Sequence, residues 1–227
     1  MNTRIFKIVL VLIITLNVSC KKTEVKLAEY KYESLPETIT CNSGYDNLLK
    51  EALYTFEEDI VNKYDSKNKN KLRAYRAYIS NFISNRIALE ETITPHSKAV
   101  YDVLKSKQDL WDNNQLNYNN KVVKCIIDNM KDKGLQQTLN ALISTNSMDS
   151  QIFAAPLRSN TSYSRDTNLA TIVALELYFS KFNTIDFTTL DLTVNQPKDQ
   201  PVDFNKRPIT APAKSTKEVD HTGHDHD

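Results

Sequence analysis

Hydrophobic residues recur every three or four positions along most of the chain between residues 45 and 182, as they do on one face of an α-helix. The first such segment, 45–64, carries Asp, Glu, Lys and Asn on its opposite face. Asn42 or Ser43 can cap its start, because a short polar side chain there accepts a hydrogen bond from a free backbone N–H. We therefore predict an amphipathic helix over 45–64.

A second segment begins near Leu72 and keeps helical spacing through Ile87. Proline disfavours helical backbone in the residue before it, so we expect this helix to end near Thr94–Pro95. Thr94 as the cap and Pro95 at the first helical position suit the start of a third helix. The third apolar face runs as far as Trp111.

The Asn-rich segment 112–120 is typical of a turn, and a fourth helix is expected over 122–130. Gly134 is a suitable closing residue for it. Residues 135–143 should continue helically after a bend, whereas 144–164 is expected to be a loop that packs partly inward.

Residues 166–182 are apolar nearly all round, which indicates a helix buried on several sides at the centre of a bundle. Asp166 can cap it. The next segment, 187–194, is compatible with a short strand or an extended strap. The scarcity of glycine, three in 227 residues, also favours helices over a β fold. The predicted fold is all-α, a single bundle of about five to six helices over 41–194.

Three residues within these apolar stripes are charged. At 100° per residue, Glu176 falls on the most apolar side of the 166–182 helix, and Arg86 and Glu90 fall within the stripe of the second helix. A buried charge is costly unless it is paired. We therefore predict a buried network of Glu176, Arg86 and Glu90 that could form a site. A structural ion pair, or exposure of that side at a bundle edge, is the alternative.

The N-terminus has the layout of a signal peptide, with cationic Arg4 and Lys7 ahead of an apolar run over 8–16. Nine helical residues reach only ~14 Å, too short to span a bilayer. Leu16-Asn17-Val18-Ser19-Cys20 resembles a lipobox, the site at which bacterial lipoproteins are lipidated on cysteine and cut just before it. Asn17 departs from the usual aliphatic residue.

This resemblance implies a signal peptide over 1–19 and a lipid, such as palmitate, on Cys20. It places the protein in the bacterial cell envelope, anchored to a membrane, and Lys21 favours the outer membrane. Residues 20–40 are charged and weakly patterned, so we expect a lipidated tether. Residues 195–227 hold prolines and charges without apolar periodicity and are expected to be a disordered tail.

The net charge of +1 excludes a strong basic field, and we expect no nucleic-acid partner. Residues 67–78 do mix cations with Tyr75 and Tyr78, a composition that can serve polyanions. A solvated helix start with Tyr75 in the core explains the same pattern.

With Cys20 assigned to lipid, Cys41 and Cys125 remain as an even pair. An oxidising envelope compartment favours a disulfide between them, and two buried free thiols are the alternative.

The last residues are rich in metal-ligand side chains: His221, His224, His226, Asp220, Asp225 and Asp227. Imidazole and carboxylate groups suit Zn, Cu or Ni, although no regular element fixes their spacing. Incidental affinity of a solvated end is the simpler interpretation.

The chain has neither a nucleophile elbow nor a glycine-rich phosphate loop. The sequence therefore favours a non-enzymatic binding or interaction module of the envelope, with an envelope protein or a glycan as partner. Metal binding by the tail is the alternative. A hydrolase would require a cleft that carries Glu176.

Overall fold

The computed structural model describes residues 25–192 and is helical, as predicted. Its described part contains seven α-helices, somewhat more than the expected five to six. They are α2 (Asp46–Tyr64), α3 (Lys71–Ile83), α4 (Pro95–Ser106), α5 (Lys121–Asp128), α6 (Lys133–Ser144), α7 (Ser150–Leu157) and α8 (Thr167–Val173). Within 25–192, no helix is both long and apolar enough to cross a bilayer.

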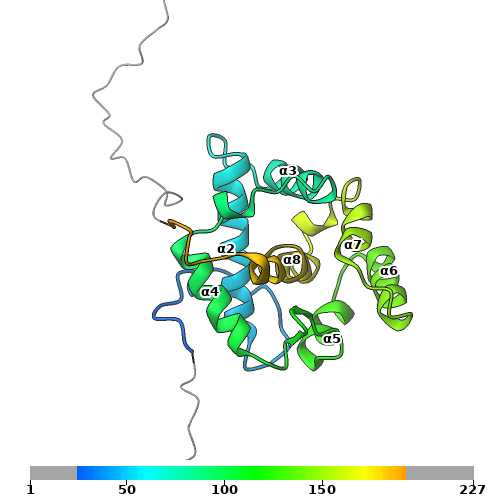
Figure 1. Cartoon of the computed structure of the whole chain (residues 1–227). Coiled ribbons are helices and arrows are strands. Elements are labelled where there is room, and N and C mark those ends of the chain that lie inside the picture. The colour runs from blue at the N-terminus through cyan, green and yellow to red at the C-terminus, as the bar shows by residue number, and fades with distance from the viewer. Residues whose placement is uncertain (1–24, 193–227) are drawn as a thin grey trace, which may run out of the picture. The chain divides into compact units, whose positions relative to one another are not determined.

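Helix α8 lies at the centre, with α2, α3, α5 and α7 arranged around it (Figure 1). Asp166 caps it by accepting a hydrogen bond from Leu169 N–H. The helical path continues through a π-helical turn, Ala174–Tyr178, and a 3₁₀ segment, Phe179–Thr184. Every residue from Leu169 to Ser180 is buried, which confirms the central position predicted for this segment. The π-helical turn was not predicted.

The structure confirms α2 close to its predicted bounds and α4 at its predicted start. The expected cap of α2 by Asn42 or Ser43 is wrong, because Tyr45 takes the cap position without a side-chain hydrogen bond. Helix α4 ends at Ser106, and Trp111, expected on its apolar face, lies in the hairpin that follows.

Thr94 and Ser97 form a reciprocal capping box at the start of α4, and Pro95 occupies the first helical position. Thr94 Oγ1 accepts from Ser97 N–H, while Ser97 Oγ accepts from Thr94 N–H. These contacts satisfy backbone donors that the first turn of a helix leaves free.

Helix α3 ends at Ile83, about ten residues earlier than predicted. Asn85 takes a left-handed conformation, with φ of 52°. The N–H groups of Asn85 and Arg86 donate back to the carbonyls of Phe82 and Asn81, which is the Schellman closure of a helix. The next regular element is a 3₁₀ turn, Leu89–Glu91.

Two further expectations about boundaries were wrong. Gly134 lies in the first turn of α6, which Asp132 caps, and does not close the preceding helix. The expected loop over 144–164 contains α7, whose cap Asp149 accepts from the N–H groups of Gln151 and Ile152. In both cases an aspartate N-cap starts a helix within a polar stretch.

The Asn-rich turn forms a two-stranded antiparallel hairpin, β1 (Trp111–Asp112) and β2 (Gln115–Leu116). Asn113 and Asn114 both have positive φ, as the tight hairpin turn requires. Within the described part of 187–194 the chain forms no strand. It lies as a strap whose Phe187, Leu190 and Leu192 pack partly buried against the core.

The packed body begins within the predicted tether rather than at residue 41. Tyr32, Thr38 and Ile39 are buried. The backbone N–H groups of Lys31 and Tyr32 donate to Glu51 on α2, at 2.8 and 3.1 Å. At least residues 31–39 are therefore held against the bundle.

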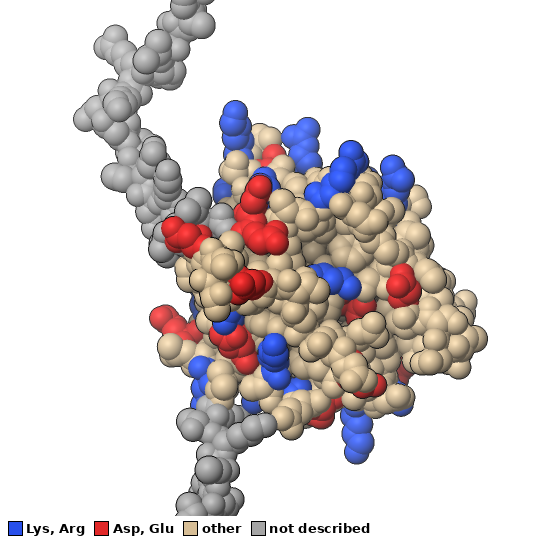
Figure 2. Space-filling model, in the orientation of Figure 1, with Lys and Arg blue, Asp and Glu red and all other residues tan. Residues whose placement is uncertain are grey.

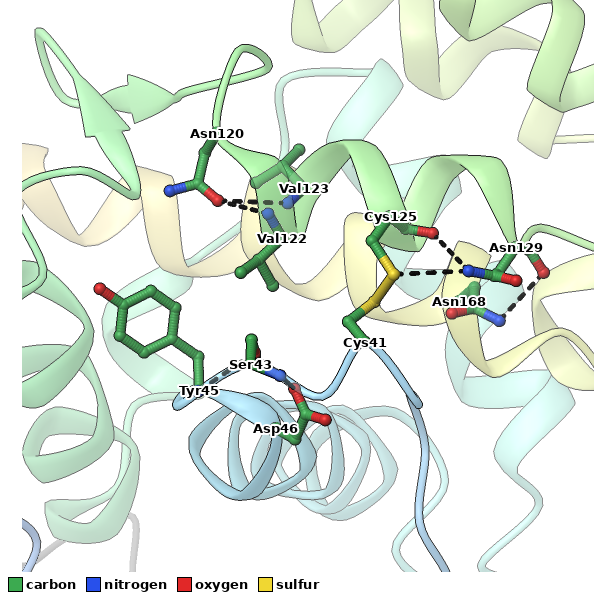
Figure 3. Close-up of a disulfide and its surroundings, with 10 residues drawn as sticks. All are labelled: Cys41, Ser43, Tyr45, Asp46, Asn120, Val122, Val123, Cys125, Asn129 and Asn168. Atoms are coloured by element: carbon green, nitrogen blue, oxygen red, sulfur yellow. Dashed lines mark hydrogen bonds between the residues drawn. A yellow bond between two sulfur atoms is a disulfide. The ribbon is translucent and has the colours of Figure 1, made fainter.

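The predicted disulfide is present between Cys41, just before α2, and Cys125 on α5 (Figure 3). The two Cα atoms are 5.9 Å apart, within the range that a disulfide spans. The bond ties the segment entering α2 to a helix 84 positions later in the chain.

Candidate functional site

A cavity of about 460 Å³ lies beside the π-helical turn. Its walls come from four places in the chain: the end of α3 with the turn after it, the hairpin region, the start of α7, and the segment from Glu176 to Ile185. The polar side chains of its lining include those of Glu90, Tyr118, Asp149, Ser150, Glu176 and Lys181. This volume suits a small molecule, and the lining is mixed in polarity.

Glu176 is the buried acid of this cavity. It lies on the π-helical turn and is only 4% exposed. Its Oε1 accepts a 2.5 Å hydrogen bond from Ser150 Oγ, whereas its Oε2 has no hydrogen-bond partner. Burial raises the pKa of Glu176 above the ordinary range, although neighbouring donors and Lys181 oppose the shift. An unpartnered oxygen on a buried carboxyl is energetically unfavourable and marks a group suited to an added donor.

Ser150 and Lys181 hold the other oxygen of this carboxyl. Lys181 Nζ donates to Ser150 Oγ at 2.7 Å, and Ser150 in turn donates to Glu176. The Lys181 ammonium also lies 5.6 Å from the centroid of the Phe82 ring. The result is a hydrogen-bonded chain from cation through hydroxyl to carboxyl.

The Tyr118 hydroxyl is the second polar group here that makes no regular hydrogen bond. It lies close enough to Glu176 for a weak hydrogen bond, which lowers the pKa of Glu176 and raises that of Tyr118, although the geometry falls short of a regular hydrogen bond. Burial, followed by the charge of Glu176, raises the pKa of Tyr118, so the phenol stays protonated at neutral pH. Glu176 Oε2 and the Tyr118 hydroxyl are thus two neighbouring buried groups of one cavity, neither of which makes a regular hydrogen bond.

The cavity lacks one arrangement that acyl transfer needs beside Ser150. The backbone N–H groups of Gln151 and Ile152, which follow the serine, already donate to Asp149. They are therefore not free to stabilise an oxyanion. The site is better arranged to bind a ligand than to use Ser150 as a nucleophile.

The predicted network of Glu176, Arg86 and Glu90 is wrong, because only Glu176 is buried. Arg86 is exposed and does not contact Glu176. Glu90 is also exposed and lies in the 3₁₀ turn, where it lines the cavity. Both were assigned to a buried stripe on the assumption that α3 continued beyond Ile83.

Sequence patterns missed a second set of acids, which lies on α2 and comprises the buried Glu51 and the partly buried Glu58. Glu51 is fully buried and accepts from the N–H groups of Lys31 and Tyr32 and, at 2.7 Å, from His96 Nε2. Glu58 pairs with the Lys31 ammonium and the Tyr32 hydroxyl. These contacts fasten the N-terminal segment to α2 and α4, which is a structural role.

The exposed cations of the 67–78 segment gather along one edge of the molecule, at the start of α3 (Figure 2). Tyr75 and Tyr78 are fully buried and point their hydroxyls to Glu57 and to the Leu177 carbonyl. Neither ring is available to stack on a base or a sugar. The hypothesis that Tyr75 and Tyr78 help to bind a polyanion is therefore wrong.

The predicted lipid site Cys20 and the tail residues His221, His224, His226, Asp220, Asp225 and Asp227 lie outside the described residues. Between residues 25 and 192, no cluster of three or more His, Cys, Asp or Glu side chains is placed to hold a metal ion.

Comparison of the chain with protein-family models, with characterised proteins and with solved structures found no match. The fold and the cavity define a helical protein with an acid-lined cavity.

Proposed function

We propose that this chain is a lipid-anchored binding protein of the bacterial envelope, and that its helical body takes up a small polar ligand in the Glu176 cavity. The observation that carries this proposal is the buried, unpartnered Oε2 of Glu176 in a cavity of about 460 Å³. A ligand that supplies a hydrogen-bond donor would satisfy an acceptor that the protein leaves without one.

Binding is favoured over hydrolysis by the contacts around Ser150. Its hydroxyl is held between Lys181 and Glu176, and the N–H groups after it are occupied by Asp149. A fixed serine of this kind serves well as a positioning group. These contacts support binding rather than serine-based hydrolysis as the role of the cavity.

A thermal-shift screen of small solutes tests the cavity. The mature chain from Lys21 should be exported behind a cleavable signal peptide, so that the disulfide forms and no lipid is attached. We expect at least one polar solute with a hydrogen-bond donor to raise the melting temperature of the native chain. Glu176→Gln, which keeps the shape of the side chain, should remove most of that rise.

Glu33→Gln is the matched control, because Glu33 is exposed and does not line the cavity. It should respond to the same solute as the native chain does. Solutes that stabilise Glu176→Gln equally well, or a screen without any stabilising solute, would contradict the proposed function.

The lipid anchor is supported by the signal-peptide layout and by the lipobox-like end at Cys20. Val25 is five residues further on, so at most about 18 Å of extended chain separates it from the anchor. Val25, Tyr30 and Leu35 are exposed hydrophobic side chains in this first described stretch, as suits a membrane-proximal position.

Metabolic labelling with an alkyne fatty acid should mark the native protein in a bacterium and leave Cys20→Ala unlabelled. Equal labelling of both would contradict the anchor.

Metal binding by the tail is the second proposal, favoured by the three histidines interleaved with aspartates over 220–227. Titration calorimetry with Zn²⁺ should show binding by the full mature chain that is lost when 220–227 are deleted. Equal binding by the deleted chain would remove the tail from metal handling.

A further inference from the structure

The charges that line the Glu176 cavity are unequal. Three carboxyl side chains contribute to the lining, those of Glu90, Asp149 and Glu176, against the single ammonium of Lys181. Arg86, on the neighbouring turn, is exposed and is not part of the wall. An excess of acidic groups favours a positively charged occupant over an anionic one.

Aromatic rings surround the same space. Tyr78, Phe82 and Tyr118 all contribute to the wall. Aromatic faces attract cations through the ring quadrupole, and the cavity already illustrates this with one of its own groups. The Lys181 ammonium lies 5.6 Å from the Phe82 centroid while it donates to Ser150.

The Glu176 carboxyl and the Tyr118 hydroxyl, neither of which makes a regular hydrogen bond, complement an ammonium rather than an anion. Glu176 Oε2 can only accept when it is ionised, and the Tyr118 hydroxyl can also accept through its oxygen. A primary ammonium carries three N–H donors, enough to serve both acceptors. A quaternary ammonium has no donor and would leave Oε2 unpartnered.

Lys181 does not already fill this role. Its ammonium reaches the carboxyl through Ser150, which donates to Oε1, and Oε2 is left without a donor. Beside these polar groups, Leu89, Leu177 and Ile185 offer an apolar wall for a short carbon chain.

From these contacts we propose that the cavity binds a small organic cation with a primary ammonium group and a short apolar body. The ammonium donates to Glu176 Oε2 and to the Tyr118 hydroxyl, and the carbon chain lies along the apolar wall. This inference rests on the proposed binding function and names the class of ligand for it.

Two probe molecules of equal chain length test whether the cavity prefers a charged ligand. Titration calorimetry of the mature chain at pH 7 should compare 1-aminohexane, which is an ammonium at this pH, with the neutral 1-hexanol. Because hydrogen bonds to charged groups contribute more than neutral ones, the amine should bind about tenfold more tightly or better. Hexyltrimethylammonium, which keeps the charge without a donor, should bind less tightly than the amine.

Two variants test whether Glu176 causes the preference for the amine over the alcohol. Glu176→Gln should bring the amine and the alcohol to similar affinity, while Glu33→Gln should keep the native preference. A preference that survives in Glu176→Gln, or equal binding of amine and alcohol by the native chain, would overturn the inference. Equal binding would still leave a neutral ligand and the proposed function intact, whereas a solute screen without any hit would remove both.

Discussion

The hydroxyl of Tyr178 donates a 2.7 Å hydrogen bond to Oδ2 of Asp59 and joins the π-helical turn to α2 across 119 positions of the chain. Asp59 Oδ1 accepts a longer bond from Thr94, the cap of α4. Asp59 is therefore the acid at which three elements meet in the core. Burial outweighs these donors and raises the pKa of Asp59 to about 7.

The raised pKa predicts how stability depends on pH. An unfolded aspartate titrates near pH ~3.9, so between about pH 4 and pH 7 the folded protein keeps a proton that the unfolded chain releases. The contribution of Asp59 to the free energy of unfolding should be complete below pH 4 and should be lost as pH rises to about 7. The loss is on the order of 4 kcal/mol.

Asp59→Asn removes this titration and should show a smaller fall in stability between pH 4.5 and pH 8. Urea unfolding at the two pH values measures it. Asp128→Asn, at an exposed position, is the matched control and should keep the native fall. A fall of native size in Asp59→Asn would show that Asp59 is ionised in the folded protein across this range.

The contacts of Glu51 predict local unfolding of the N-terminal segment. Glu51→Ala leaves the N–H groups of Lys31 and Tyr32 without their acceptor, and His96 without its partner. We expect the amides of residues 31 and 32 to lose hydrogen-exchange protection by about tenfold or more, with a stability loss of about 1–3 kcal/mol. Glu29→Ala, at an exposed position, is the control and should keep native protection of these amides. Equal protection in Glu51→Ala and Glu29→Ala would contradict the role of Glu51 in holding the N-terminal segment.

The disulfide should contribute strongly to stability. For a span of 84 residues, the chain-entropy treatment gives an upper figure of about 4–5 kcal/mol. The double variant Cys41→Ser/Cys125→Ser should lose up to this amount in urea unfolding. The native chain under reductant should match it, and native stability in either case would contradict the bond's role.

Helix α6 closes with the same motif as α3, and this predicts a residue preference. Asn146 has φ of 51°, and the N–H of Ser147 donates to the Leu142 carbonyl. Asn146→Gly should leave stability nearly unchanged or raise it, because glycine adopts this conformation freely. Asn146→Ala should cost about 1 kcal/mol. Thermal unfolding of both variants measures the difference, and equal melting temperatures would argue against a left-handed Asn146.

Much of the fold could be predicted because two local signals agreed. Over 45–64 and 166–182 the apolar spacing is regular, and at Thr94–Pro95 the capping chemistry is unambiguous. Prediction failed where backbone conformation, rather than hydrophobicity, ends an element. The stripe through Ile87 is apolar, but the left-handed Asn85 has already closed α3.

Only part of the candidate site could be predicted from the sequence. Glu176 could be found because it interrupts the most apolar face of a buried helix. Tyr118 and Ser150 could not, because they come from two other segments that only the tertiary fold brings together, whereas Lys181 lies on the same predicted helix as Glu176 but was not singled out. Ser150 was assigned to a loop, since the helix that it begins is short and contains Pro156.

The central claim is that the Glu176 cavity is a ligand site. A crystal structure of the mature chain with the best solute from the thermal-shift screen tests it most directly. If the cavity is a ligand site, ligand density should lie in it, with a donor atom about 3 Å from Glu176 Oε2. Ligand density elsewhere on the molecule, with the cavity empty and Oε2 still unpartnered, would contradict it.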